Sequence, residues 1–538
     1  MSAEPATDTF ELAIAARGVP RGAAMLERAR WGARAFAGYD LASVRRIVLA
    51  AAEAGADHAA EFAEKAVAET GFGVVEHKVI KNLACSTGLL DTYRDHDYVS
   101  VRVDPVAKIV EVPRPAGVVL ALTPSTNPVA TVYFKTLLAL MTRNAVVISP
   151  HPYARNVCSQ AARTMAQAAV AAGAPDGVVQ WVQEPSIPLV NALMTDERTD
   201  VIVATGGTAM VRAAYRSGNP AIGVGPGNVP VLVDRTADLQ RAAQRIVDSK
   251  SFDNSILCTN ESVLVVEDTV ADRLLAHMRH AGAYLLTDDE RDRIRELVFP
   301  GGVFDPRLVG RDASWVAEQA GIRVGPKTRV LLAPIDLPVP EEPLAHEKLL
   351  PVLGVLRVPS ASRGIQAACS LLRIGGAGHS AAIHSADPAT ILAFGTAVRV
   401  LRVCVNVGSS LGSSGMETNL APSMTIGTGY FGRSSVGENL QPSHLVNWTR
   451  LAYNADAREA MPDFTALTPW QAPSGPVPAY PLASNAAGSA ALSPPANRSP
   501  DHTTPGIAGR TPGTVEAGEL REEIRRLIVE ELRDIIKG

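Results

Sequence analysis

The sequence contains few cysteines, and none is spaced to pair with another. The five are far apart, odd in number and without CxxC spacing: Cys85, Cys158, Cys258, Cys369 and Cys404. This pattern argues against a disulfide framework and against a zinc site, so we expect no metal and a reducing cytosol. Each cysteine by itself is expected to be a small buried residue.

The sequence also lacks long apolar runs and a strong excess of one charge. No apolar run approaches the roughly 18 residues of a membrane-spanning helix. Residues 1–18 include Glu4 but no apolar segment of the kind that a secretion signal needs. The formal net charge of −4 gives no indication of nucleic acid or an anionic membrane as a partner. Because 46% of the 538 residues are hydrophobic and 20% are charged, we expect a globular cytoplasmic protein of two or three domains.

The middle of the chain alternates between short β-rich runs and helical segments. Residues 22–97 are rich in Ala, Glu and Arg and predict mostly helix. Residues 98–115 alternate in strand fashion around a turn at Asp104-Pro105. Further strands are predicted at 117–122, 144–149, 178–182, 200–205, 229–234 and 262–267, and helices at 131–143 and 156–173. Such alternation predicts an α/β fold in which helices cover both faces of a parallel sheet.

The composition changes sharply after about residue 463. Residues 464–513 are rich in Pro, Ala, Ser, Gly and Thr. They cannot bury enough apolar surface to offset the entropy of ordering, so we expect a disordered linker. Residues 514–538 predict a tethered amphipathic helix, because the following apolar residues fall near helical spacing: Leu520, Ile524, Leu527, Ile528, Leu532, Ile535 and Ile536.

Four segments contain residue types suited to chemistry: "LTPSTNP" (122–128), "VATGGTAMVRAAY" (203–215), "GVGPGNVPVLVD" (223–234) and "SFDNSILCTNES" (251–262). The Gly-Gly pair of the second lies between a predicted strand and a predicted helix, where free backbone N–H groups could meet a phosphate. Taken singly, each segment is weak. A Gly-Gly pair is usually a tight connection, an Asn such as Asn127 is often a turn former, and there is no GxGxxG fingerprint.

Together, in this order and spacing, these blocks resemble the aldehyde dehydrogenase superfamily, and more closely its CoA-acylating branch. The resemblance runs from about Arg21 to Tyr453 and includes "HEKLLPVL" and "GGAGHSAAIHS". It implies the aldehyde dehydrogenase fold and a homodimer or homotetramer. The implied parts are a Rossmann-like NAD-binding domain at 1–227 with a hairpin arm near 98–114, an α/β catalytic domain at 228–420, and a return at 421–463 to the NAD-binding and oligomerisation region.

The resemblance also implies roles for single residues. Cys258 would attack an aldehyde, and the Asn127 amide with the Cys258 N–H would stabilise the resulting oxyanion. Glu347 would hydrogen-bond the nicotinamide ribose, with a surface charge as the alternative. His379 would take the proton of the CoA thiol, with a packed, hydrogen-bonded histidine as the alternative. The other implied cofactor-binding residues are Thr123, Ser149, Thr205, Gly206, Gly207 and Gly225. Because Ser149 stands where many relatives have a ribose-binding lysine, NAD is expected and NADP stays open.

One departure from the family pattern concerns the acyl acceptor. Hydrolytic members carry a glutamate that activates water just before the Gly-Gly of the loop matching "GVGPGN". Here the matching place is Val224 or Gly225, and neither can accept a proton. We therefore expect coenzyme A as the acceptor and an acyl-CoA as the product. The alternatives are a hydrolytic aldehyde dehydrogenase that releases a free acid and a scaffold protein with a vestigial site.

The substrate and the location follow from two weaker resemblances. Residues 428–453 resemble the branch that acts on short aldehydes such as propanal or sulfoacetaldehyde. The predicted helix at 514–538 resembles the terminal peptides that load enzymes into bacterial microcompartments. Shell proteins would then be partners and the microcompartment lumen the location, with a coiled-coil or self-association segment as the alternative.

Overall fold

The computed structural model describes residues 18–464 and 467–475. They belong to the first of two compact units of the chain, residues 1–483, whereas the second unit is residues 484–538. The predicted helix at 514–538 and most of the predicted linker at 464–513 therefore lie outside the described residues. No helix in the described part is long and apolar enough to cross a membrane.

A five-stranded parallel sheet forms the first half of the fold, in the strand order β5-β4-β3-β6-β7. Its strands are β3 (Val118–Thr123), β4 (Ala145–Pro150), β5 (Val179–Trp181), β6 (Val201–Thr205) and β7 (Ala221–Val224). Every residue of β3 and β4 is buried, as expected for central parallel strands covered on both faces. The strands predicted from the apolar runs in this part of the chain are confirmed.

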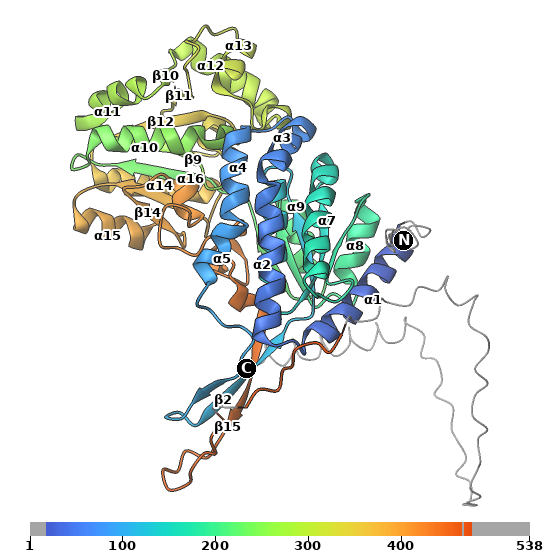
Figure 1. The fold of residues 1–538 in the computed structure, drawn as a ribbon. Helices are drawn as coiled ribbons and strands as arrows, with labels where there is room; N and C mark the ends of the chain where they lie inside the picture. The colour runs from blue at the N-terminus through green and yellow to red at the C-terminus, as the bar shows by residue number, and fades with distance from the viewer. Residues whose placement is uncertain (1–17, 465–466, 476–538) are drawn as a thin grey trace, which may run out of the picture. The chain divides into compact units, whose positions relative to one another are not determined.

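Helices cover this sheet in more than one layer. They are α1 (Val19–Phe36), α2 (Leu41–Asp57), α3 (Ala59–Thr70), α4 (Val75–Ala84), α5 (Thr87–Tyr93), α6 (Pro128–Met141), α7 (Arg155–Ala171), α8 (Ile187–Thr195) and α9 (Thr208–Arg216). Helices α6 and α7 pack against the sheet and against each other, and α2 packs against both of them. Figure 1 shows α2 beside α7. Helix α1 packs against β3, β4 and α8. The mostly helical prediction for residues 22–97 is confirmed.

A seven-stranded parallel sheet forms the second half, in the order β10-β11-β12-β9-β8-β13-β14. Its strands are β8 (Val229–Val233), β9 (Glu261–Glu267), β10 (Ala283–Leu285), β11 (Val330–Pro334), β12 (Val352–Val358), β13 (Ala381–His384) and β14 (Val403–Val405). Alternate residues of β8 enter two separate cores, with Val231 and Val233 on one face and Leu232 on the other. The sheet is therefore buried between two helical layers.

The helices around this sheet follow the strand alternation. They are α10 (Leu239–Ser251), α11 (Asp268–His280), α12 (Asp288–Val298), α13 (Ala313–Gln319), α14 (Ala361–Ile374), α15 (Pro388–Ala397) and α16 (Ser409–Ser413). Helices α10 and α11 pack against each other on one face, and α14 packs against β8 and β9 and against α15. The α/β fold with parallel sheets that the sequence predicts is confirmed.

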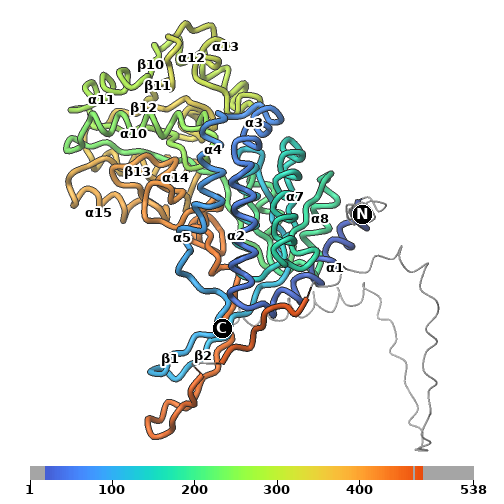
Figure 2. The backbone as a smooth tube through the Cα atoms, in the orientation of Figure 1, coloured from blue at the N-terminus to red at the C-terminus, as the bar shows by residue number. Residues whose placement is uncertain are grey.

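A three-stranded antiparallel sheet is built from β1 (Arg102–Asp104), β2 (Ile109–Pro115) and β15 (Val446–Ala452). Figure 2 shows β1 and β2 as the hairpin predicted at 98–115, with the C-terminal strand alongside. The turn of this hairpin includes Lys108, whose φ is 54°. The Arg102 guanidinium lies 3.8 Å from the centre of the Trp448 ring, which ties β1 to β15 across β2.

Residues 467–475, at the start of the predicted linker, contact the first half of the fold. The Gln471 N–H donates to the Gly38 oxygen at 3.1 Å, and the Asp40 N–H donates to the Gln471 oxygen at 3.2 Å. The Arg143 guanidinium lies 4.3 Å from the centre of the Trp470 ring. This short piece is therefore packed rather than disordered, because one aromatic side chain and two backbone hydrogen bonds hold it.

Candidate active site

One large cavity lies at the carboxyl ends of β3, β4, β6 and β7 and extends to the loop that carries Cys258. Its volume is about 800 Å³. Strand β3 has β4 on one side and β6 on the other, so the strand order reverses at β3. Open parallel sheets bind their ligands at such a switch point. The predicted site residues that line it are Thr123, Asn127, Ser149, Thr205, Gly206, Gly207, Gly225, Cys258 and Glu347. The structure thus brings every predicted site residue except His379 to one cavity.

Cys258 follows a turn with an unusual backbone. Asp253, Asn254 and Ser255 are all left-handed, with φ values of 48°, 53° and 62°. This conformation costs a non-glycine residue about 1–2 kcal/mol, so three in succession require compensating contacts. The Asp253 N–H donates to Nδ1 of His77 at 2.8 Å. Because His77 belongs to helix α4, this bond ties the first residue of the turn to that helix.

Asn260 holds the other end of the same loop. Its Nδ2 donates to the backbone oxygens of Ser255 at 3.0 Å and Leu257 at 2.6 Å. The fully buried Lys250 ammonium in turn donates to the Asn260 Oδ1. These hydrogen bonds fix the backbone on the N-terminal side of Cys258 and at Asn260 on its C-terminal side. The loop backbone therefore determines where the Cys258 thiol lies.

The Cys258 thiol is surrounded by groups that favour its protonated form. Burial raises the pKa of the thiol to about 12, and the Glu347 carboxylate contributes in the same direction. The Arg402 guanidinium opposes both with a smaller effect. Cys258 is therefore a neutral thiol at neutral pH, and only its deprotonated form would be a strong nucleophile.

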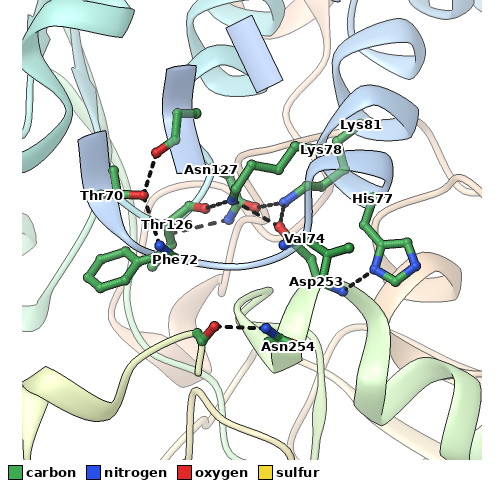
Figure 3. Close-up of polar contacts among 12 residues, drawn as sticks. Thr70, Phe72, Val74, His77, Lys78, Lys81, Thr126, Asn127, Asp253 and Asn254 are labelled. Carbon is green, nitrogen blue, oxygen red and sulfur yellow. Dashed lines mark hydrogen bonds and ion pairs between the residues drawn. The ribbon is translucent and has the colours of Figure 1, made fainter. Parts of the chain in front are cut away.

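Asn127 is the residue immediately before α6. Its backbone oxygen accepts hydrogen bonds from the Thr131 N–H at 3.1 Å and the Thr131 hydroxyl at 2.6 Å, which fixes its main chain. Its side chain is only 9% exposed and lies between the cavity and the Lys81 ammonium, which donates to Oδ1 (Figure 3). The amide is thus held from behind by a buried cation.

Glu347 lines the same cavity. The Gly227 N–H donates to its Oε1 at 3.0 Å, which leaves the second oxygen for other partners. Burial raises the pKa of this carboxyl to about 8, although the Gly227 hydrogen bond and the charges of Lys250 and Lys348 lower it. An oriented carboxyl group with a pKa near neutrality can accept a hydrogen bond from a hydroxyl or a proton from a stronger acid.

The glycines of the cavity wall fit a bound dinucleotide. A Cβ atom added to Gly206, Gly207 or Gly225 would meet nothing within 4 Å, so the space beside these residues is open and no protein contact explains the missing side chains. Gly207 is the N-cap of α9 and makes no side-chain capping bond, so backbone N–H groups at the start of α9 remain for an anion. These residues could hold the phosphate groups of a cofactor.

His379 lies behind the cavity wall. Its side chain is fully buried, its Nδ1 is 3.1 Å from the Ser380 hydroxyl, and the Arg402 guanidinium donates to its backbone oxygen at 3.0 Å. A Cβ on Gly227 would lie 3.2 Å from the His379 ring and 2.2 Å from the Cys258 oxygen, so Gly227 separates the two. Burial, assisted by Arg402, lowers the pKa of His379 to about 3. In this structure it is a packed neutral histidine, and its role toward a CoA thiol stays a prediction.

The family position of the water-activating base holds no proton acceptor. Val224 ends β7 and is buried, and Gly225 follows it on the cavity wall. Among the described residues that line the cavity, Glu347 carries the only carboxyl group. The cavity therefore presents a thiol, two side-chain amides, the His151 imidazole and one oriented carboxyl.

Three charged residues next to this site were missed by the sequence analysis: Lys81, Lys250 and Asp253. All three are fully buried. The available signal was that Asp253 stands within the "SFDNSILCTNES" segment that holds Cys258 and that Lys250 directly precedes this segment. Lys81 had no such signal, because it belongs to a helix far away in sequence.

Comparisons with known proteins agree on one family. The family model described as "Aldehyde dehydrogenase family" matches residues 2–419. The chain is 38% identical over 439 residues to the bifunctional aldehyde-alcohol dehydrogenase AdhE of Escherichia coli, which covers 80% of the chain but 49% of AdhE. The chain thus spans about half the length of this relative. It is also 36% identical over 436 residues to the acylating sulfoacetaldehyde dehydrogenase of Cupriavidus necator, covering 80% of the chain and 88% of that protein.

Solved structures show the same fold. An acetylating aldehyde dehydrogenase from Geobacillus thermoglucosidasius superposes with a TM-score of 0.80 at 35% identity, covering 85% of this chain and all of the other. The propionaldehyde dehydrogenase of Rhodopseudomonas palustris, solved with bound CoA and an acylated cysteine, has a TM-score of 0.73 at 28% identity, covering 80% and 97%. A propionaldehyde dehydrogenase from a Clostridium phytofermentans fucose utilisation microcompartment has a TM-score of 0.73 at 27% identity, covering 80% and 98%.

Proposed function

Because the chain belongs to the aldehyde dehydrogenase family, we propose that it oxidises a short aldehyde to the corresponding acyl-CoA through a thioester on Cys258. NAD is the expected hydride acceptor, with NADP as the alternative. The observation that carries this proposal is a cavity that contains Cys258 and Asn127 but has no proton acceptor at Val224 or Gly225. The nucleotide, when bound, would accept the hydride.

The residues of the cavity would divide the first half-reaction between them. Cys258 attacks the carbonyl carbon once its thiol has passed its proton to solvent water, and the carbonyl oxygen becomes an oxyanion. The Asn127 Nδ2–H and the Cys258 backbone N–H donate to that oxygen. Glu347 holds the ribose of the nucleotide through its free oxygen. Loss of hydride from the adduct then leaves an acyl group on Cys258.

The second half-reaction would transfer this acyl group to the thiol of CoA. Water is a poor competitor, because no carboxylate stands at the family position that would take its proton. The Rhodopseudomonas palustris relative was solved with CoA and an acylated cysteine together, which supports the same pair of species here. The proposal therefore predicts an enzyme that stalls as a thioester when CoA is absent.

Mixing enzyme, NAD and propanal without CoA tests this proposal. We expect a burst of about one NADH per active site followed by slow turnover, and steady turnover after CoA is added. Rapid steady turnover without CoA would show a hydrolytic aldehyde dehydrogenase instead. If neither NAD nor NADP is reduced, with or without CoA, the protein would be one with a vestigial site.

The cavity favours a neutral aldehyde over a sulfonated one. The described residues that line it include no lysine or arginine, and several of those near the cysteine are apolar, among them Ile256, Leu257, Met424 and Ile426. A sulfonate buried without a cation would lose its hydration uncompensated. We therefore propose a propanal-like substrate over sulfoacetaldehyde. A panel of two- to four-carbon aldehydes, compared by kcat/KM with NAD and NADP, tests the choice, and a preference for sulfoacetaldehyde would contradict it.

We further propose that residues 514–538 bring the enzyme into a bacterial microcompartment by binding shell protein. The support is the apolar stripe in the sequence together with a microcompartment relative among the solved structures. Leu527→Glu, which puts a charge in the stripe, should abolish co-purification with shell protein and leave specific activity unchanged. Arg526→Glu, on the opposite face of the expected helix, is the control. If Leu527→Glu instead changes the oligomeric state, the segment serves self-association.

A further inference from the structure

A buried cluster of charges lies directly behind the Asn127 amide. Lys78 and Lys81, one turn apart on α4, both direct their ammonium groups at the Asp253 carboxylate, and all three side chains are at most 4% exposed (Figure 3). The Lys78 Nζ lies 3.1 Å from the Asp253 Oδ2. Burial raises the pKa of Asp253, but the two ammonium groups lower it by more than burial raises it, so the pKa lies below its ordinary value. Two cations thus share one anion.

Lys81 makes a second contact that Lys78 does not make. Its ammonium donates to the Asn127 Oδ1 as well as to the Asp253 Oδ2. Apart from the Asp253 carboxylate, Lys78 donates to a backbone oxygen of the neighbouring loop, that of Thr126 at 3.3 Å. Lys81 is therefore the member of the cluster that contacts the predicted oxyanion donor itself.

This contact decides which way the amide faces. An ammonium group can donate but cannot accept, so the amide atom next to Lys81 must be the oxygen. The amide nitrogen then faces the other way, where the Thr126 hydroxyl accepts one of its two hydrogens at 3.2 Å. The second hydrogen remains for the cavity that Asn127 lines. Without Lys81 the amide could rotate and present its oxygen to an oxyanion, which would be repulsive.

Asp253 joins this support to the Cys258 loop. It is the first of the three left-handed residues, and its Oδ1 accepts the Val74 N–H at 2.6 Å while its own N–H donates to His77. The same carboxylate therefore fixes Lys81 and the turn that precedes Cys258. The two predicted oxyanion donors, one from each half of the fold, have a common anchor on α4.

We propose that Lys81 is a positioning residue for the oxyanion donor, holding the Asn127 amide with its N–H toward the cavity and polarising that amide through a charged hydrogen bond. The inference rests on the proposed function, since it concerns the same reaction. A cation on the amide oxygen strengthens the amide N–H as a donor, and the effect is large where water is excluded. Lys81 acts only through Asn127 and does not touch the substrate.

The matched variants are Lys81→Met and Lys78→Met, each alone and combined with Asn127→Ala. Both remove one buried ammonium group and leave Asp253 with the other. Since loss of a whole oxyanion donor costs about 10²–10³ in kcat, Lys81→Met should lower kcat by about 10- to 100-fold with little change in the KM for aldehyde. Lys78→Met should lower kcat much less. Lys81→Gln, which keeps an uncharged donor, should fall between wild type and Lys81→Met.

The double variants separate positioning from general destabilisation. If Lys81 acts through Asn127, Lys81→Met should have almost no further effect on kcat in the Asn127→Ala background, whereas the small effect of Lys78→Met should persist there. Thermal unfolding and NAD binding of each variant monitor the fold. Equal effects of Lys81→Met in both backgrounds would overturn the proposal, as would failure of both Lys81 variants to fold while Lys78→Met folds. A wild-type protein without CoA-dependent NADH formation would instead contradict the proposed function.

Discussion

Replacing Gly225 by glutamate should put a proton acceptor at the family position that lacks one. A Cβ at this position would meet nothing within 4 Å, and Gly225 is not among the glycines with positive φ, so the backbone accepts a side chain. The new carboxyl would extend into the cavity that Cys258 lines. It could take a proton from a water molecule that attacks the thioester, and the enzyme would then release free acid without CoA.

The size of this effect can be worked out from Glu347. General-base catalysis contributes about 10²–10⁴-fold. Burial raises the pKa of Glu347 to about 8 in the same cavity, and partial burial should shift the pKa of a glutamate at position 225 in the same direction, with that of Glu347 as the upper bound. About one tenth of a carboxyl group with the pKa of Glu347 is ionised at pH 7. CoA-independent turnover should therefore increase by about 10- to 10³-fold at pH 7 and increase further toward pH 9.

The assay is NADH formation from aldehyde and NAD without CoA, combined with measurement of the free acid. Gly225→Gln is the matched control, since it fills the same space but cannot accept a proton near neutral pH. The glutamate variant should show steady turnover with a rising pH profile, whereas the glutamine variant should show only the burst. Equal rates for the two variants, or no gain above wild type while NAD binding is intact, would refute the reasoning about the missing base.

Three further outcomes follow from the site. Cys258→Ala should abolish NADH formation and leave NAD binding and the melting temperature near wild type, and substantial turnover would remove Cys258 from the mechanism. Asn127→Ala should lower kcat by about 10²–10³-fold, and a loss seen only in KM would indicate substrate positioning instead. Because burial raises the pKa of the Cys258 thiol to about 12, its thiolate is the minor form. Alkylation of the nucleotide-free enzyme by iodoacetamide should therefore accelerate about tenfold per pH unit from pH 7 to 10, and a plateau by pH 8 to 9 would show an ordinary thiol.

The elements that could be predicted from the sequence are those that local pattern determines. Strands β3 and β4 are buried throughout, and a strand with two buried faces is a continuous apolar run that is visible without its neighbours. The hairpin of β1 and β2 likewise depends on one turn. The cavity residues followed from long blocks similar to a known family, in which Cys258 and Asn127 hold fixed places.

The features that could not be predicted depend on contacts between distant segments. Strand β15 pairs with β2, and Trp470 meets Arg143, although each pair is far apart in the chain. The turn at Asp253 is left-handed at three successive residues without a glycine. Asp and Asn tolerate this conformation as single residues, but local propensity does not favour three in succession. It persists because partners from α4 hold it, and Asp253 and Lys81 are 172 residues apart. The burial of His379 behind Gly227 is a tertiary contact of the same kind.

The contacts around Asp253 also show why the site cannot be assigned to one half of the fold. Asn127 immediately precedes α6 beside the five-stranded sheet, whereas Cys258 follows α10 of the seven-stranded sheet. Helix α4 contacts both, because Lys81 binds the Asn127 amide and the Asp253 carboxylate together. A strained turn keeps its shape only when its surroundings determine it completely, and here those surroundings come from residues 74–81. Under the proposed mechanism, helix α4 therefore holds the nucleophile and its oxyanion donor in one frame.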